Sequence, residues 1–352
     1  MDLISDIETH LEKGLDINLP DINGNTFLHK AILENNPRAI EFLLDKGADI
    51  NWKDTRGIPP LLTAVIFDNK DIVDLLLEKG ANPNDTDNNR GTPLHWACYL
   101  DLRNSKGIVD SLFKKGADIN SLDTQERTPF FMATNSDNDN VDMIKKLLDY
   151  GANPEKIDSV ELIPPLFNAI RNNKTNIVRF LLGILPNVDT MVCAEYTPLH
   201  YAVTHLSSEK IIDLLLGVKG ISIDIKDSDG QTPLYNAIAI PNFDMVKTLI
   251  ESGANINVQD NDGNTPLHWA AMITGNDEEI IRIIEYIVTI LDDDSRGVFS
   301  QPLSPPQEDD NQGGGRIKRK TKKKSRKSKR SRKSKRSRKS KRSRKSKKSK
   351  KK

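Results

Sequence analysis

The feature that most constrains the fold is a six-residue sequence that recurs along most of the chain. TPLHWA begins at Thr92 and again at Thr265, and a second sequence of the GADIN type keeps in phase with it, as at Gly47 and Gly116. Related versions of TPLHWA begin at residues 26, 59, 128, 164, 197 and 232. Two sequences locked to one period of about 33 residues indicate a repeat array.

One period, residues 51–84, carries the signals of a turn followed by two short helices. Asp54 to Gly57 favours a tight turn, because glycine accepts positive φ and aspartate bonds to its own backbone. In TPLH the threonine can cap a helix, and the proline suits its first position. A second, apolar helix includes Ile72, and Gly80 ends it. Two such short helices cannot bury their apolar faces alone, so neighbouring units must stack.

The DxxG turn, TPLHxA, the IVxLLL helix and GADIN together resemble the ankyrin repeat. The resemblance covers residues 1–291 and implies an all-α repeat fold, a solenoid of helix-turn-helix units with β-hairpin-like fingers. We expect an N-terminal half repeat, LISDIETHLEKGLDIN, that supplies only a second helix, followed by about eight repeats.

Several repeats depart from the regular length. The third, fourth and sixth are longer than the others, and we expect their additional residues in the turn between the two helices, where a loop can lengthen without disturbing the core. The fifth repeat lacks its turn glycine, and Leu185 replaces its exit glycine. These changes predict an irregular solenoid over residues 155–196.

The histidines decide whether the chain is expected to be an enzyme. Four of the six, His29, His95, His200 and His268, occupy the same position of TPLHxA. The resemblance implies that this imidazole links one repeat's turn to the next through hydrogen bonds. The sequence has no nucleotide-binding loop, paired metal ligands or nucleophile constellation. We therefore expect no catalytic residue, cofactor or metal site.

The resemblance also implies that fingers and first helices form a concave face that binds another protein. Trp96 and Trp269 fill the variable position of TPLHxA, as Met132 and Tyr201 do in other repeats. These side chains either pack against the fingers or form an apolar strip that anchors a partner. The candidate partner-binding residues are Trp52, Arg56, Arg90, Trp96, Met132, Tyr196, Tyr201 and Trp269.

The formal net charge of +2 hides a strong asymmetry. Residues 316–352 contain 26 Lys and Arg and no acidic residue, which leaves residues 1–315 with a net charge of about −24. Residues 292–315 have the Pro, Gly and acidic content of a disordered linker, and the basic tail after them is too polar to fold when free.

The cysteine count and the length of the apolar stretches bear on the cellular compartment of the protein. With two cysteines, Cys98 and Cys193, no disulfide framework is expected, which suits a reducing compartment. The start of the chain does not resemble a signal peptide, and its longest apolar stretches are too short to span a bilayer. We expect an intracellular monomer in the cytoplasm, the nucleus or both, without a membrane span.

The tail repeats the sequence SRKSKR and allows more than one interpretation. It can bind DNA or RNA phosphates through counterion release, or it can serve only as a nuclear or nucleolar targeting signal that import receptors bind. Anionic membranes and acidic proteins are further possible partners. The candidate polyanion-binding residues are Lys318, Arg319, Lys320, Lys322, Lys323, Lys324, Arg326, Lys327, Lys329 and Arg330. Such tails resemble those of giant DNA virus proteins, which implies a location in the host cell.

Overall fold

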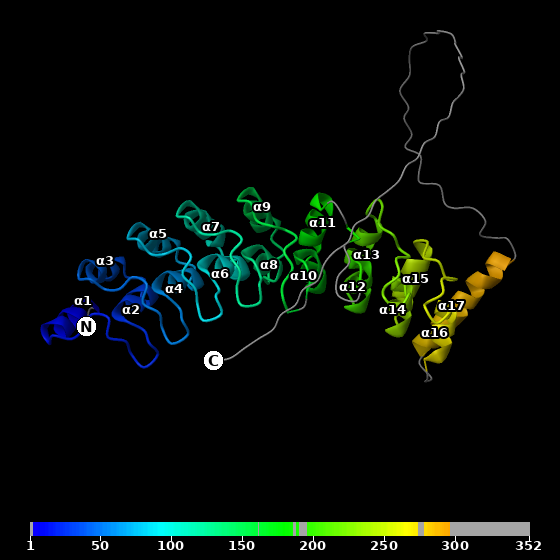
Figure 1. Cartoon of the computed structure of the whole chain (residues 1–352), viewed down its shortest axis with the longest axis horizontal. Coiled ribbons are helices and arrows are strands. Elements are labelled where there is room, and N and C mark those ends of the chain that lie inside the picture. Colours follow the sequence, from blue (N-terminus) through cyan, green and yellow to red (C-terminus); the bar gives the residue numbers. More distant parts are fainter. Residues whose placement is uncertain (1–2, 161, 186–187, 190–195, 274–277, 296–352) are drawn as a thin grey trace, which may run out of the picture. The chain divides into compact units, whose positions relative to one another are not determined.

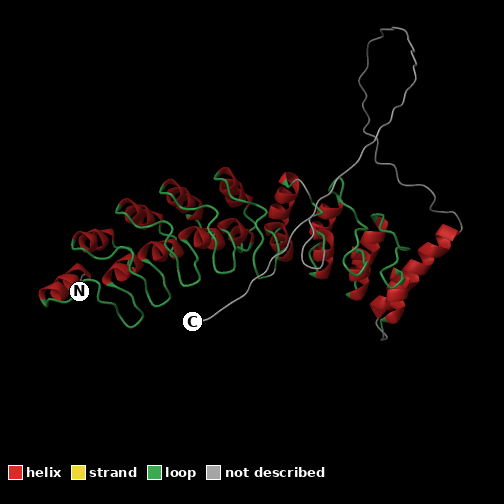
Figure 2. Cartoon of the chain, viewed as in Figure 1, coloured by secondary structure: helices red, strands yellow, loops and turns green. Residues whose placement is uncertain are grey.

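A computed structural model describes residues 3–160, 162–185, 188–189, 196–273 and 278–295. These residues form 17 α-helices, and no strand is assigned among them (Figure 2). No helix in this described part is long and apolar enough to cross a membrane. The expected basic tail and most of the expected linker lie outside the described residues.

The helices follow the predicted order of one half repeat and eight helix pairs (Figure 1). Helix α1 spans Leu3–Glu12 and is the second helix of the half repeat. The first helices are α2 Phe27–Leu33, α4 Pro60–Ile66, α6 Pro93–Leu100, α8 Pro129–Thr134, α10 Pro165–Arg171, α12 Pro198–Thr204, α14 Pro233–Ala239 and α16 Pro266–Met272. The second helices are α3 Pro37–Asp45, α5 Lys70–Glu78, α7 Ser105–Lys114, α9 Val141–Asp149, α11 Thr175–Ile184, α13 Glu209–Leu216, α15 Phe243–Glu251 and α17 Glu278–Ser295.

Each first helix packs against the second helix of its own repeat and against the first helix of a neighbouring repeat, and several second helices also contact one another. First helices contact first helices, as α4 contacts α6, and second helices contact second helices, as α5 contacts α7 (Figure 1). The Leu and Ala of TPLHxA point into this stack, and Leu61 and Ala64 are fully buried. One apolar core therefore runs without a break from Leu3 to Ile287.

The first helices begin as their sequences predict. Thr92 has extended backbone angles and its hydroxyl accepts a bond from the backbone N–H of His95, which makes it the N-cap of α6. Pro93 follows at the first helical position, where no N–H is needed. In α4 and α10, Pro59 and Pro164 take the N-cap position, and the cap there has no side-chain hydrogen bond.

Among the fingers that the structure describes in full, the one before a first helix is a turn closed by an aspartate. Asp87 Oδ1 accepts the backbone N–H groups of Asn89 at 2.8 Å and Gly91 at 2.7 Å. Gly57 shows why glycine belongs in the turn, since its φ is +76° and a Cβ would lie 2.7 Å from the backbone nitrogen of Asn88. The expected β-hairpin-like finger is thus a capped turn rather than a ladder of two strands.

The additional residues of the fourth repeat lie where predicted, in the loop between α8 and α9. In the third repeat the loop 101–104 is one residue longer than the loop 67–69, and α6 and α7 are each one residue longer than α4 and α5, so the additional residues are shared between the turn and the helix ends. The sixth repeat differs from the prediction. Leu215, the last buried residue of α13, lies five positions before Gly220, whereas Leu76 lies four before Gly80. One additional residue therefore follows α13 instead of preceding it.

The fifth repeat keeps both of its helices, α10 and α11. Leu162 takes a φ of +57° at its finger, a conformation that glycine adopts in regular fingers. Leu185 ends α11 in an extended conformation, and residues 186–187 and 190–195 beyond it lie outside the described residues. At the other end, α17 continues to Ser295, past the boundary expected at residue 291.

A candidate protein-binding surface

In three repeats the histidine of TPLHxA joins its repeat to the next finger. In each case the Nε2–H donates to a backbone oxygen of the next finger. His29 donates to Ile58 at 3.2 Å, His95 to Arg127 at 2.9 Å and His200 to Gln231 at 3.2 Å. The other ring nitrogen, Nδ1, accepts a hydrogen bond from the backbone N–H of the threonine at the start of the same helix. The N–H of Thr92, for example, donates to His95 Nδ1 at 3.2 Å. Both nitrogens of these rings therefore serve the stack.

Burial and the bond accepted at Nδ1 favour the neutral form of the ring. Burial lowers the pKa of His95, although the carbonyl of Arg127 and nearby aspartates favour the charged form. Protonation would place a hydrogen on Nδ1, which faces the N–H of Thr92. The pKa values of His29 and His200 are lowered by burial in the same way. A neutral, donor-and-acceptor imidazole is the form that the array uses.

The three tryptophans each fix their indole to a finger. Trp96 donates from Nε1 to Asp87 Oδ2 at 2.9 Å, and Trp269 donates to Asp260 Oδ2 at 2.7 Å. Trp52 donates to the backbone oxygen of Gly24 at 3.2 Å. The polar edge of each ring is occupied while the ring itself stays partly exposed. Packing against a finger and exposure to a partner are therefore compatible.

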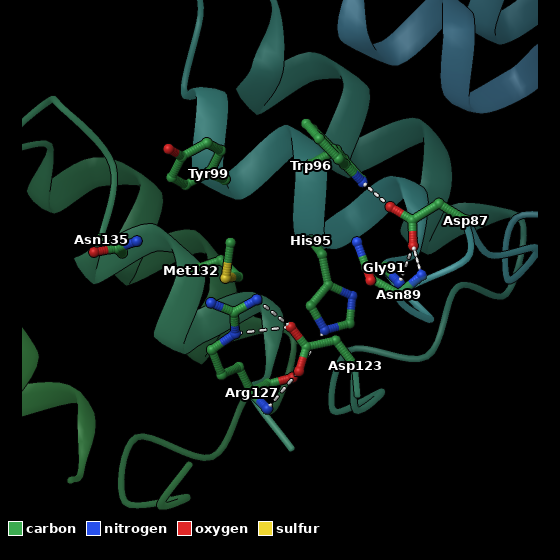
Figure 3. Close-up of a pocket in the computed structure, with 10 residues that line it drawn as sticks. All are labelled: Asp87, Asn89, Gly91, His95, Trp96, Tyr99, Asp123, Arg127, Met132 and Asn135. Atoms are coloured by element: carbon green, nitrogen blue, oxygen red, sulfur yellow. Dashed lines mark hydrogen bonds and ion pairs between the residues drawn. The ribbon is translucent and has the colours of Figure 1, made fainter. Parts of the chain in front are cut away.

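A pocket of about 280 Å³ opens between the third and fourth repeats (Figure 3). Trp96, Tyr99 and Met132 line it together with Asn135, and Asp123 and Arg127 lie at its lower edge in the view (Figure 3). Arg127 Nη2 lies 2.6 Å from Asp123 Oδ2, so this cation is already balanced. The pocket has the combination of apolar walls and fixed polar groups that is typical of anchor sites.

Tyr99 is part of this pocket although the sequence analysis did not select it. It lies three positions after Trp96, so both face the same side of α6, and its side chain is 39% exposed. Leu33 and Ile66 occupy the equivalent positions of α2 and α4, and Leu33 is also exposed. We call Leu33, Ile66, Trp96, Tyr99 and Met132 the first-helix strip, since each repeat from the first to the fourth contributes to it.

Arg56 and Tyr196 lie in other fingers than those of the pocket, whereas Arg90 lies in the finger whose Asn89 and Gly91 line the pocket but is not itself a lining residue. Arg56 bonds to Asp54 Oδ2 through Nε at 3.0 Å and Nη2 at 2.9 Å, and its side chain is largely exposed. Arg90 is exposed at a finger tip. Tyr196 stacks on His200 with ring centroids 5.5 Å apart.

Tyr201 does not offer the partner surface that its position predicts. Its side chain is only 7% exposed. The ring packs edge-on against Phe167 at 5.2 Å and stacks on His205 at 3.9 Å. These neighbours place Tyr201 in the core, and we exclude it from the candidate surface.

The fold and the linking histidines define a repeat protein whose units stack only on their neighbours. Family models described as "Ankyrin repeats (3 copies)" match residues 52–123, 130–227 and 207–288, and "Ankyrin repeats (many copies)" matches residues 7–44. The chain belongs to the ankyrin repeat family. Proteins of this family are typically interaction modules rather than enzymes, and membership supports a protein-interaction scaffold.

The relatives found include two proteins of fowlpox virus (strain NVSL) that are named as ankyrin repeat proteins. One is 39% identical over 88 residues, which cover 24% of this chain and 20% of the relative. The other is 30% identical over 113 residues, which cover 32% of this chain and 15% of the relative. The chain thus matches a minor part of each relative. Both are viral proteins, as the sequence resemblance indicated.

Proposed function

We propose that the array binds a protein partner through the first-helix strip, with the pocket between the third and fourth repeats as its anchor. The observation that carries this proposal is the exposure of Tyr99 beside Trp96 and Met132 in a preformed pocket. Aromatic side chains in such pockets tend to dominate binding energy at interfaces. The indole of Trp96 is held by its hydrogen bond to Asp87, and an ordered side chain loses little entropy on binding, so Trp96 should favour partner binding further.

The test is affinity capture with the full chain and a double variant, Tyr99→Ala with Met132→Ala. Neither side chain is fully buried, so the fold is expected to survive, and circular dichroism checks this. A partner captured by the native chain should be lost with the double variant and retained with Phe67→Ala, an exposed aromatic in the loop after α4. Equal capture by both variants would reject the strip as the binding surface.

We further propose that the basic residues of the tail bind nucleic acid or another polyanion. The 26 cationic residues without an acid among residues 316–352 support this, because cations that neutralise phosphates release counterions. Aromatic residues do not interleave the charges, so base stacking is not expected. Binding should therefore depend on salt and not on base sequence.

A salt series with the full chain and duplex DNA tests the tail. Each phosphate engaged should contribute about −0.9 to the slope of log affinity against log salt. A variant with glutamine at the ten selected Lys and Arg positions between residues 318 and 330 should have a shallower slope and weaker binding. A slope that the substitutions leave unchanged would place nucleic acid elsewhere on the protein.

A targeting signal remains the second candidate for the tail. Lys- and Arg-rich stretches such as KRKTKKK at residues 318–324 are typical of nuclear localisation signals. In that case the glutamine variant should lose nuclear accumulation and binding to import receptors, while the native chain should bind duplex DNA only weakly at physiological salt. This function would place the protein in the nucleus or nucleolus of the host cell, and the polyanion function alone does not require that.

A further inference from the structure

The last helix of the array has a stacking surface that no other described residue covers. In α5 and α9 the second residue of an apolar pair, Val73 and Ile144, is fully buried, and the next repeat packs over these helices. The corresponding pair in α17 is Ile280 and Ile281. Ile280 is buried against the array, whereas Ile281 is 47% exposed. Within the part of the chain that the structure describes, the face that internal repeats bury is thus exposed at this end.

The open face continues along α17 as a stripe. Val288 lies seven positions after Ile281, on the same side of the helix, and is 41% exposed. Half-buried Ile284 and Leu291 complete a series at i, i+3, i+7 and i+10. Helix α17 has 18 residues, whereas the other second helices have 8 to 10. The stripe is therefore longer than stacking within the array requires.

The N-terminal end of the array is built differently. Helix α1 buries Leu3 and Ile7 on its inner side, next to α3, and its exposed residues include Glu8 and Glu12. Repeat arrays need such polar outer faces at their ends to stay soluble. At the C-terminal end the stripe of α17 lacks this polar cover, and Met272 of the neighbouring α16 is also exposed. This contrast indicates an interface rather than a cap.

Charge argues against a second copy of this chain as the occupant. Helix α17 carries six carboxylates and one cation, Arg282. Arg282 bonds to Glu279 at 2.7 Å and lies 4.1 Å from the ring centroid of Phe243, so it is engaged within the array. A second copy would bring one acidic helix against another, and such like-charge contact is unfavourable.

We propose that the outer face of α17 binds an amphipathic helix of another protein, with apolar residues at i, i+3 and i+7 flanked by Lys and Arg. The apolar stripe supplies the contact area, and the acidic edges select a basic partner. This surface is separate from the first-helix strip and does not depend on it. The array would then have two binding surfaces, one along its first helices and one at its end.

Two synthetic helical peptides as long as α17 test the proposal with the full chain. Both carry leucine on one face, and they differ only in having lysine or glutamate on the flanks. In fluorescence anisotropy, the lysine peptide should bind at least about tenfold more tightly than the glutamate peptide. Glu285→Lys, at an exposed position of α17, should reduce this preference without lowering helix content.

A double variant locates the site. Ile281→Gln with Val288→Gln should weaken binding of the lysine peptide by at least about tenfold. Phe67→Gln, an exposed apolar residue elsewhere, and the Tyr99→Ala, Met132→Ala pair should leave it unchanged. Circular dichroism confirms that each variant folds, and the Glu285→Lys result stands even if the double variant does not fold.

Four outcomes would overturn the proposal. Equal affinity for both peptides would remove the charge argument, and unchanged binding by the double variant would remove the site. A concentration-dependent dimer of the native chain in light scattering, lost in the double variant, would assign the face to a second copy. The peptide could also bind only after the basic residues of the tail are changed to glutamine. That result would assign the outer face of α17 to this chain's own tail.

Discussion

The linking histidine shows how one side chain fastens two repeats together. His95 caps its own helix through Nδ1 and reaches Arg127 of the next finger through Nε2 at 2.9 Å. The resemblance to a known repeat implied this role from sequence. The structure adds the direction of each bond and therefore the tautomer. His268 lies in the last repeat and is exposed, and among the described residues it caps its own helix without a bond to another finger.

We expect His95→Ala to destabilise the array while His268→Ala changes its stability little. The first substitution leaves the carbonyl of Arg127 without its buried donor, which costs about 1–3 kcal/mol. The second removes a ring that has no following finger to join. Urea unfolding of both variants measures the difference, and equal midpoints would contradict the linking role.

Acidification should destabilise the array through its buried histidines. Burial lowers the pKa values of His29, His95 and His200 in the folded chain. Below a pH of about 6.5 the unfolded chain therefore takes up protons that the folded chain does not, and stability falls until the folded rings also titrate. Thermal unfolding between about pH 7.5 and pH 5 should show this loss. A midpoint that rises as the pH falls would contradict it.

Aspartates of the fingers act in a lower pH window. Burial would raise the pKa of Asp54, but bonds from Ile58 and Arg56 together lower it below its ordinary value. The stability that Asp54 contributes is present above the unfolded pKa, about 3.9, and is lost as the pH falls through the lower folded value. The two windows separate the contributions of histidines and finger aspartates.

Tyr201 and Tyr99 show which part of the surface could not be predicted from sequence. Both lie on first helices at positions that face away from the core of their own repeat. Tyr201 is nevertheless buried because Phe167 of the preceding repeat and His205 of its own repeat enclose it. Exposure in a stacked array depends on what the neighbouring repeat places opposite, which the pattern within one repeat does not contain.

At the scale of helices, the half repeat acts as a cap that sequence alone could assign. Helix α1 has the length and apolar spacing of a second helix, and it packs on α3 as predicted. The sixth repeat was harder to place, because GVKG after α13 contains two glycines that could each end a helix. The continuation of α17 to Ser295 was likewise missed, since its final residues are acidic rather than apolar.

Replacement of Ile7 tests the cap. Ile7 is fully buried, so Ile7→Ala should lower stability by about 2–5 kcal/mol. Ile22→Ala is the matched control, because Ile22 is 96% exposed at the first finger. Deletion of residues 1–18 should go further and cause aggregation, since it uncovers the apolar face of the first full repeat. A deleted chain as stable as the native one would contradict the capping role.

At the scale of the molecule, the chain combines an acidic repeat array with a strongly basic tail, and its central property is the surface that the array offers to a partner. The number of repeats could be predicted from the period of the sequence. The family resemblance predicted that the first helices contribute to the partner-binding face. The stack of repeats determined where apolar side chains stay exposed, on the first-helix strip and on α17.

A photo-crosslinking amino acid in place of Tyr99, in the full chain inside host cells, tests this central claim most directly. The account predicts crosslinks to a defined protein from this position, and their loss when Met132→Ala is added. The same amino acid at Phe67, in the loop after α4, should give none to that protein. Equal crosslinking from both positions, or crosslinks at Tyr99 that Met132→Ala does not affect, would contradict the assignment of the first-helix strip as the binding surface.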